Sequence, residues 1–172
     1  MPAIRLELLS EAHLPAVEEL LTDDGVLRFT RVPEPVPPGF AKTWLAFYED
    51  GRRDGTREAF AIVSVAEARF LGLALAVRIN HEEQTVELGY VVAPSARGRG
   101  VATEALRLLT EWALTDLKAL RVELWIDVLN EASKRVAEHC GYVREGVLRS
   151  VYFKQGRRHD FEIWSRLPTD PE

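Results

Sequence analysis

Apolar and polar residues recur along the chain with two periods, which predict its strands and helices. Alternation with a period of two predicts strands over residues 4–9, 59–65, 70–79, 85–92, 121–128, 142–153 and 159–167. Apolar residues spaced three and four apart predict helices over residues 10–21, 40–48, 100–117 and 130–140. This order predicts an α+β fold, a mixed sheet of about seven strands flanked by about four helices.

Two segments between these elements are expected to be irregular. Four prolines, each lacking an N–H and fixing φ, lie within residues 32–39, so neither a helix nor a central strand is expected there. A loop of this length often shapes a binding site, so we expect it and the helix after it to shape one here. Residues 51–57 are polar and charged and are expected to form a turn.

Length and composition are those of an ordinary soluble domain. The 172 residues favour a single domain over residues 1–172, with 47% hydrophobic and 28% charged residues. The net charge of −5 argues against a nucleic-acid partner and weakly suits a basic one. The single cysteine, Cys140, allows no disulfide within the chain and fits a reducing compartment. Because no long apolar run occurs, we expect a cytoplasmic protein without a signal peptide or a membrane partner.

The segment with the clearest chemical signal is the loop at residues 97–102, between a strand ended by Pro94 and the best helix of the sequence. Free N–H groups and a partial positive charge at the start of a helix favour an anion. Gly98 and Gly100 let the backbone approach that anion, and Arg97 and Arg99 add cationic donors. The glycine spacing is neither that of a Walker A loop nor that of a Rossmann fingerprint.

This loop and a second motif resemble one family. Arg97-x-x-Gly100-x-Ala102 is similar to the Arg/Gln-x-x-Gly-x-Gly/Ala signature of the GNAT superfamily of N-acetyltransferases. The run from Asn130 through Ser133 to Gly141-Tyr142 and Glu145-Gly146 resembles the branch of the ribosomal-protein N-terminal (alanine/serine) acetyltransferases. The similarity extends over residues 4–167. It implies a GNAT-like fold with a central, mostly antiparallel, twisted sheet.

The resemblance also implies acetyl-CoA as the acyl donor and assigns residues that bind it. The backbone of Tyr90, Val91 and Val92 would pair with the pantetheine arm on a strand that splays from its neighbour. The pyrophosphate would lie in the loop and on the first turn of the helix, with Arg97 nearby. It would accept hydrogen bonds from the backbone amides of Gly98, Arg99, Gly100, Val101, Ala102 and Thr103. Asn130 would contact the coenzyme, cap its own helix, or do both.

The same resemblance names candidate catalytic residues. Glu87 is a candidate general base, because an amine must lose a proton before it attacks; its alternative role is a cross-strand ion pair. Glu123 and Asp127, on the next strand, remain possible bases. Ser133 is a candidate donor of a proton to the leaving thiolate, or makes a local bond to the backbone. The four histidines lack metal-ligand spacing, so no metal is expected.

The expected reaction is direct transfer of an acetyl group from acetyl-CoA to a primary amine in a ternary complex. The branch suggests the α-amine of a protein N-terminus. One alternative is a small-molecule amine, such as an amino sugar, a polyamine or an amino-acid derivative. Another is a non-catalytic acyl-CoA sensor. An edge strand of the C-terminal hairpin could pair with a second copy, giving a homodimer.

Overall fold

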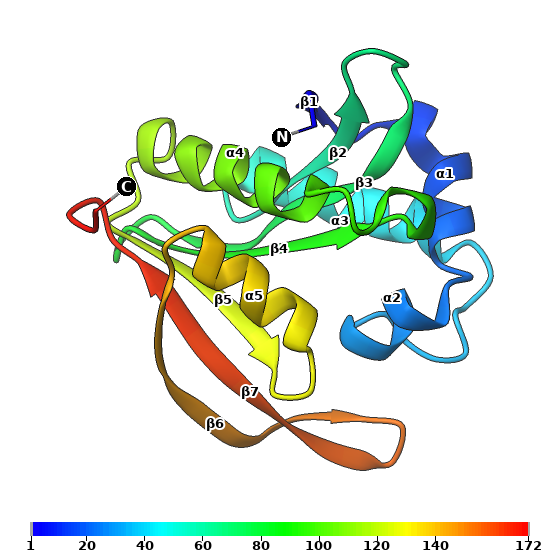
Figure 1. Cartoon of the computed structure of the whole chain (residues 1–172). Coiled ribbons are helices and arrows are strands. Elements are labelled where there is room, and N and C mark those ends of the chain that lie inside the picture. Colours follow the sequence, from blue (N-terminus) through cyan, green and yellow to red (C-terminus); the bar gives the residue numbers. More distant parts are fainter. Residues whose placement is uncertain (1, 172) are drawn as a thin grey trace.

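A twisted seven-stranded sheet forms the centre of the protein in the computed structural model, which describes residues 2–171 (Figure 1). The two expected domain bounds, residues 1 and 172, lie outside this range. The strand order is β1-β2-β3-β4-β5-β7-β6, and within residues 2–171 only β4 and β5 pair in parallel. The strands are β1 (Ile4–Leu8), β2 (Glu58–Ser64), β3 (Phe70–Asn80), β4 (Thr85–Val92), β5 (Arg121–Asp127), β6 (Val143–Lys154) and β7 (Arg157–Arg166). The prediction of a mostly antiparallel seven-stranded sheet is confirmed.

Helices cover both faces of this sheet. The described residues form α1 (Leu14–Leu20), α2 (Asp24–Phe29), α3 (Phe40–Asp54), α4 (Val101–Thr115) and α5 (Glu131–His139), with short 3₁₀ turns at Glu11–His13 and Pro94–Ala96. Helices α4 and α5 lie on one face, and α1 and α3 on the other (Figure 1). Leu106 and Leu109 of α4 are fully buried, and each stabilises the fold by about 1.5–3 kcal/mol. None of the described helices is both long and apolar enough to cross a lipid bilayer.

Two helical segments differ from the expectation. The turn expected at residues 51–57 is wrong over its first part, because α3 continues to Asp54 and ends at Gly55, whose φ is 72°. Arg52 and Arg53 lie in the last turn of α3, where cations interact favourably with the helix dipole. Helix α2 was not expected at all. It begins at the cap Asp23, which accepts a hydrogen bond from the Val26 N–H at 2.8 Å.

Strands β4 and β5 separate towards their C-terminal ends. Their parallel pairing runs from Thr85↔Arg121 to Leu88↔Leu124 and stops there, although both strands continue. On its other edge, β4 stays paired with β3 as far as Gly72↔Val92. Residues 89–92 therefore have one backbone edge that does not pair with β5, as the family resemblance predicted.

The β6–β7 hairpin extends beyond the other strands of the sheet, and its tip contacts the segment just after α2 (Figure 1). Its turn is made by Gln155 and Gly156, with φ values of 49° and 76°, as a type I′ turn requires. Near the tip, Lys154 Nζ lies 2.8 Å from the Glu34 carboxylate and donates to the Thr30 carbonyl at 3.0 Å. These contacts fix the segment between α2 and α3 against the hairpin.

Candidate active site

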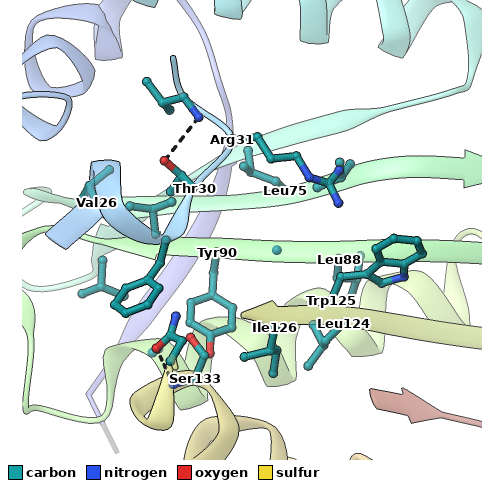
Figure 2. A pocket seen from close by; sticks show the side chains of 18 of the residues that line it. Val26, Thr30, Arg31, Leu75, Leu88, Tyr90, Leu124, Trp125, Ile126 and Ser133 are labelled. Carbon is teal, nitrogen blue, oxygen red and sulfur yellow. Dashed lines mark hydrogen bonds between the residues drawn. The ribbon is translucent and has the colours of Figure 1, made fainter. Parts of the chain in front are cut away.

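A cavity of about 1280 Å³ follows the gap between β4 and β5 (Figure 2). It extends from the first turn of α4 to the segment after α2 and the first half of α3. Because successive side chains of a strand point to opposite faces, β4 divides its contribution between two sides. Tyr90 packs against the core under α4 and α5, whereas Val91, and with it Glu87, faces α3. The gap connects these two sides.

The loop before α4 presents free backbone N–H groups to this cavity. Gly98 and Gly100 have φ values of 72° and 77°, a left-handed conformation that a Cβ disfavours. Glu104 donates the first hydrogen bond of the helix, to the Gly100 carbonyl at 3.1 Å, so the N–H groups before it lack helical partners. The predicted loop residues that line the cavity are Arg97, Gly98, Gly100, Val101, Ala102 and Thr103, whereas Arg99 is exposed and lies outside the lining.

Arg97 makes contacts within the protein that its sequence motif did not reveal. Its Nη2 lies 2.5 Å from Asp23 Oδ1, and its Nε donates to the Val92 carbonyl at 3.1 Å. The hydrogen bond from Arg97 is the main reason that the pKa of Asp23 is lowered. Arg97 therefore ties the end of β4 to the cap of α2, and its contact with a coenzyme stays a prediction.

On the α5 side of the gap, Ser133, Asn130 and Tyr90 lie together. Asn130 Oδ1 accepts a hydrogen bond from the Ser133 N–H at 3.1 Å, so Asn130 caps α5, which is one of the two roles expected for it; its contact with a coenzyme stays a prediction. The Tyr90 side chain extends toward Ser133 (Figure 2). Its buried hydroxyl has no hydrogen-bond partner among the described residues. Burial raises the pKa of Tyr90 to about 12, although the nearby Ser133 lowers it in part, so the phenol keeps its proton at neutral pH.

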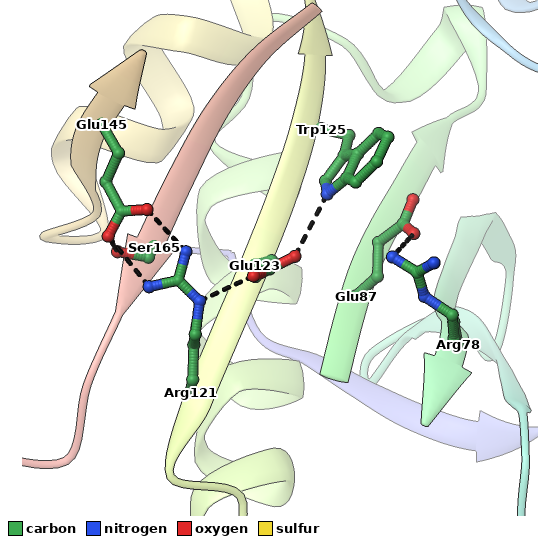
Figure 3. Close-up of polar contacts among 7 residues, drawn as sticks. All are labelled: Arg78, Glu87, Arg121, Glu123, Trp125, Glu145 and Ser165. Carbon is green, nitrogen blue, oxygen red and sulfur yellow. Dashed lines mark hydrogen bonds and ion pairs between the residues drawn. The ribbon is translucent and has the colours of Figure 1, made fainter. Parts of the chain in front are cut away.

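On the α3 side of the gap, Glu87 is held by two arginines. Its side chain is 7% exposed, with Oε1 3.0 Å from Arg31 Nη2 and Oε2 3.3 Å from Arg78 Nη2. Arg78 is also its partner in the β3–β4 register, just after a bulge in β3 (Figure 3). Glu87 thus makes the cross-strand ion pair that the sequence allowed, and it also lines the cavity.

The two other carboxylates considered as bases differ in position. Glu123 accepts hydrogen bonds from Arg121 Nε at 2.6 Å and Trp125 Nε1 at 3.2 Å and lies outside the cavity lining (Figure 3). Asp127 lines the cavity, is 8% exposed, and pairs with His159 Nδ1 at 3.0 Å. Glu87 and Asp127 are therefore the candidates with access to the cavity.

Sequence reasoning missed several residues at the α3 end of the cavity. Val32 and Pro33 of the proline-rich segment line it, as expected, and so does Trp125. Arginines on three different segments line it as well, Arg31, Arg57 and Arg78. No local motif marks these arginines; the only available signal was the cross-strand position of Arg78, which needs the register of β3 and β4.

Comparisons with known proteins identify the same family across most of the chain. The family described as "Acetyltransferase (GNAT) domain" matches residues 3–143, which include β4, the loop and α5. The Bacillus subtilis protein named Probable N-acetyltransferase YjcK is 32% identical over 114 residues, 66% of this chain. The matched part of this chain spans 63% of the length of YjcK.

Two solved structures share the fold. Spermidine N-acetyltransferase from Vibrio cholerae, in complex with CoA and spermine, has a TM-score of 0.85 at 22% identity and covers 97% of this chain and 96% of its own. RimL, a ribosomal L7/L12 α-N-protein acetyltransferase in complex with coenzyme A, has a TM-score of 0.86 at 20% identity and covers 96% and 94%. One of these proteins is named for a polyamine and the other for a protein N-terminus, so similarity alone leaves the acceptor amine open.

Proposed function

The chain belongs to the GNAT acetyltransferase family and is an acetyl-CoA-dependent N-acetyltransferase, and on that premise we propose that it acetylates the N-terminal α-amine of a protein or peptide. The observation that carries acetyl transfer from acetyl-CoA, the reaction on which this proposal depends, is the separation of β4 and β5. Residues 89–92 have a backbone edge that does not pair with β5, and they lie between Glu87 and the loop at residues 97–102.

The residues around the gap fit acetyl-CoA, which supplies an activated thioester. The free N–H groups at the start of α4 suit its pyrophosphate, with Gly98 and Gly100 allowing close approach. The open edge of Tyr90, Val91 and Val92 suits the pantetheine amides. A backbone N–H of this edge would stabilise the negative charge that develops on the thioester carbonyl. Asn130 would approach the same arm from the cap of α5.

Glu87 and Ser133 would move the protons of the reaction. Glu87 takes a proton from the acceptor ammonium, directly or through water, so that a neutral amine attacks. The C–N bond forms, the C–S bond breaks, and Ser133 Oγ donates a proton to the departing thiolate. Ser133 stands on the α5 side of the gap and Glu87 on the α3 side, so the base and the acid act from opposite faces of β4.

The choice of an α-amine over a polyamine rests on the second motif and on charge. The motif at residues 130–146 resembles that of the ribosomal-protein acetyltransferases. The α3 end of the cavity is lined by three arginines and by one carboxylate, Glu87, and a polycation would be repelled there. The non-catalytic sensor is disfavoured by the positions of Glu87 and Ser133, because both side chains line the cavity.

Mass spectrometry of acetylated peptides tests this proposal. The substrate is a peptide with a free N-terminal serine and one internal lysine; its matched control carries a formyl group on the α-amine, and spermidine is assayed in parallel. We expect acetylation of the α-amine alone and no reaction of the blocked peptide. Acetylation of spermidine or of the lysine in place of the α-amine would contradict the proposal, and coenzyme binding without transfer to any amine would favour the sensor.

We also propose that two copies pair through the edge strand β6. This strand ends the sheet and exposes Val143, Val147 and Phe153 at 56%, 40% and 60%. Sedimentation velocity of the wild type and of Val147→Glu tests the pairing. The matched control is Val65→Glu, at an exposed site beyond β2. A dimer lost only in Val147→Glu is the expected result; a wild-type monomer would contradict it.

A further inference from the structure

Three guanidinium groups gather at the α3 end of the cavity. Arg31 follows α2, Arg57 precedes β2, and Arg78 lies on β3; together we call them the arginine cluster. One carboxylate, Glu87, lines the cavity beside them. The other carboxylate of the lining, Asp127, is already paired with His159. The arginine cluster therefore carries more positive charge than the neighbouring protein groups neutralise.

Glu87 occupies only part of the hydrogen-bonding capacity of this cluster. The Glu87 carboxylate contacts Nη2 of Arg31 and Nη2 of Arg78, whereas each guanidinium has five N–H donors. The two arginine side chains are 46% and 62% exposed, so their other donors are accessible. Arg57 forms no ion pair with any described acidic side chain; its guanidinium lies over the Phe47 ring, 4.0 Å from the centroid.

Aromatic rings hold the cluster in place. The Trp125 ring centroid lies 5.9 Å from Arg31 Cζ and 5.5 Å from Arg78 Cζ, so one ring contacts both guanidiniums. Burial strongly raises the pKa of Tyr48. The charges of Arg57 and Arg31 lower this pKa, and the charge of Glu87 raises it. The charges of these three residues therefore act on one point of the cavity, the Tyr48 hydroxyl.

We propose that the arginine cluster binds a carboxylate carried by the acceptor, so that the enzyme prefers a primary amine with an acidic group close to it. This inference rests on the proposed function and specifies its substrate class. Guanidinium groups bind carboxylates through short, paired hydrogen bonds, and each of the three arginines keeps donors that no described acidic side chain occupies. The positive field also disfavours the ammonium form of the acceptor and so favours the neutral amine that attacks.

The carboxylate could come from two sources, an acidic side chain near a peptide N-terminus or the α-carboxylate of a free amino acid. Three peptides that differ only at the second residue separate charge from shape: Ser-Asp, Ser-Asn and Ser-Lys, each followed by two alanines and a C-terminal amide. Alanine and alaninamide form the second pair. Each acceptor is assayed for kcat/KM, and its binding to the enzyme–CoA complex is measured by calorimetry, which does not depend on turnover.

The variants Arg57→Gln and Arg78→Gln test the cluster, with Arg53→Gln as the matched control on the exposed side of α3. We expect kcat/KM for the Ser-Asp peptide to exceed kcat/KM for the Ser-Asn peptide by about tenfold or more, as a charge-assisted hydrogen-bonded pair allows. Both cluster variants should reduce this ratio toward one, and Arg53→Gln should keep it.

Each outcome separates the inference from the proposed function. Equal kcat/KM values for the Ser-Asp and Ser-Asn peptides would overturn the inference and leave N-terminal acetylation standing. A higher kcat/KM for the Ser-Lys peptide would have the same meaning. A preference for alanine over alaninamide, with no peptide acetylated, would overturn N-terminal acetylation and support the carboxylate site. If no acceptor reacts, equal affinities of the acidic and neutral peptides for the CoA complex would still overturn the inference.

Discussion

Arg31 Nη2 lies 3.0 Å from Oε1 of Glu87, although 56 residues separate the two in the sequence. This ion pair joins the segment after α2 to β4, so one wall of the cavity is fastened to the strand whose C-terminal half does not pair with β5. The segment is also fastened from the opposite side, where Lys154 near the hairpin tip donates to the Thr30 carbonyl. The position of the Glu87 carboxylate is therefore set by tertiary structure as well as by its strand.

Replacing Glu87 by glutamine should lower kcat by about 10²–10⁴-fold, the usual contribution of a general base. The amide keeps the size of the side chain but cannot accept the proton of the acceptor. Glu123→Gln is the matched control, because Glu123 lies on the neighbouring strand and outside the cavity lining. Steady-state rates with a saturating peptide measure the effect. Equal losses in the two variants, or a loss only in Glu123→Gln, would remove Glu87 from the mechanism.

Replacing Ser133 by alanine should lower kcat by about 10²-fold while the KM for acetyl-CoA changes little, because the hydroxyl acts on the leaving group. Asn130 would still cap α5, since it accepts from the Ser133 backbone N–H and not from its side chain. Thermal unfolding of the variant checks that the helix is intact. A rate equal to that of the wild type would show that another group protonates the thiolate.

Tyr90→Phe should keep or increase stability and still reduce kcat. The Tyr90 hydroxyl is buried without a hydrogen-bond partner in residues 2–171, so its removal costs no hydrogen bond in the free enzyme. The hydroxyl lies beside Ser133, so its removal should slow proton donation to the thiolate. Urea unfolding and steady-state kinetics measure the two effects. An unchanged kcat would limit Tyr90 to packing and backbone contacts.

Gly98→Ala should weaken acetyl-CoA binding by about tenfold or more, because the methyl group enters the space of the pyrophosphate and strains the loop. Gly156→Ala is a matched control, since both glycines have a left-handed φ, 72° and 76°, and no atom lies within 4 Å of an added Cβ at either. The two variants should lose similar stability, and only Gly98→Ala should lose affinity in calorimetry. Equal affinities would place the pyrophosphate elsewhere.

The stability of the protein should depend on Glu145 above about pH 4.5 and lose this dependence in acid. Hydrogen bonds from Arg121 and then Ser165 lower the pKa of Glu145 from 4.5 to about 2 (Figure 3). A carboxyl whose folded-state pKa is depressed stabilises the fold above its unfolded-state pKa, and the stabilisation disappears as pH falls toward the folded-state value. The difference in unfolding free energy between the wild type and Glu145→Gln should thus shrink as pH falls from about 4.5 to about 2. A difference that stays constant with pH would contradict this account.

The sequence predicted the elements that its local pattern controls. Strand β4 has the expected bounds, because alternation defines it and Pro94 stops it. The loop before α4 was found because its glycines and the start of the helix are adjacent in sequence. Helix α2 was missed because its six residues are too few for a clear periodicity, and it depends on the side-chain cap from Asp23.

The α3 end of the cavity could not be predicted in the same way. Arg31, Arg57 and Arg78 come from three segments, and only the folded chain brings them to one end of the cavity. The pairing of Arg78 with Glu87 also requires the bulge in β3, which shifts the register by one residue and has no clear sequence signal.

Initial rates of thiol release, measured over a matrix of acetyl-CoA and peptide concentrations, test the central claim most directly. Direct attack across the gap between β4 and β5 requires both substrates to be bound together. The account therefore predicts double-reciprocal lines that intersect, with no thiol release when the amine is absent. Parallel lines would indicate an acetylated enzyme and contradict the mechanism, and the absence of acetyl-CoA binding would contradict the assignment of the cavity itself.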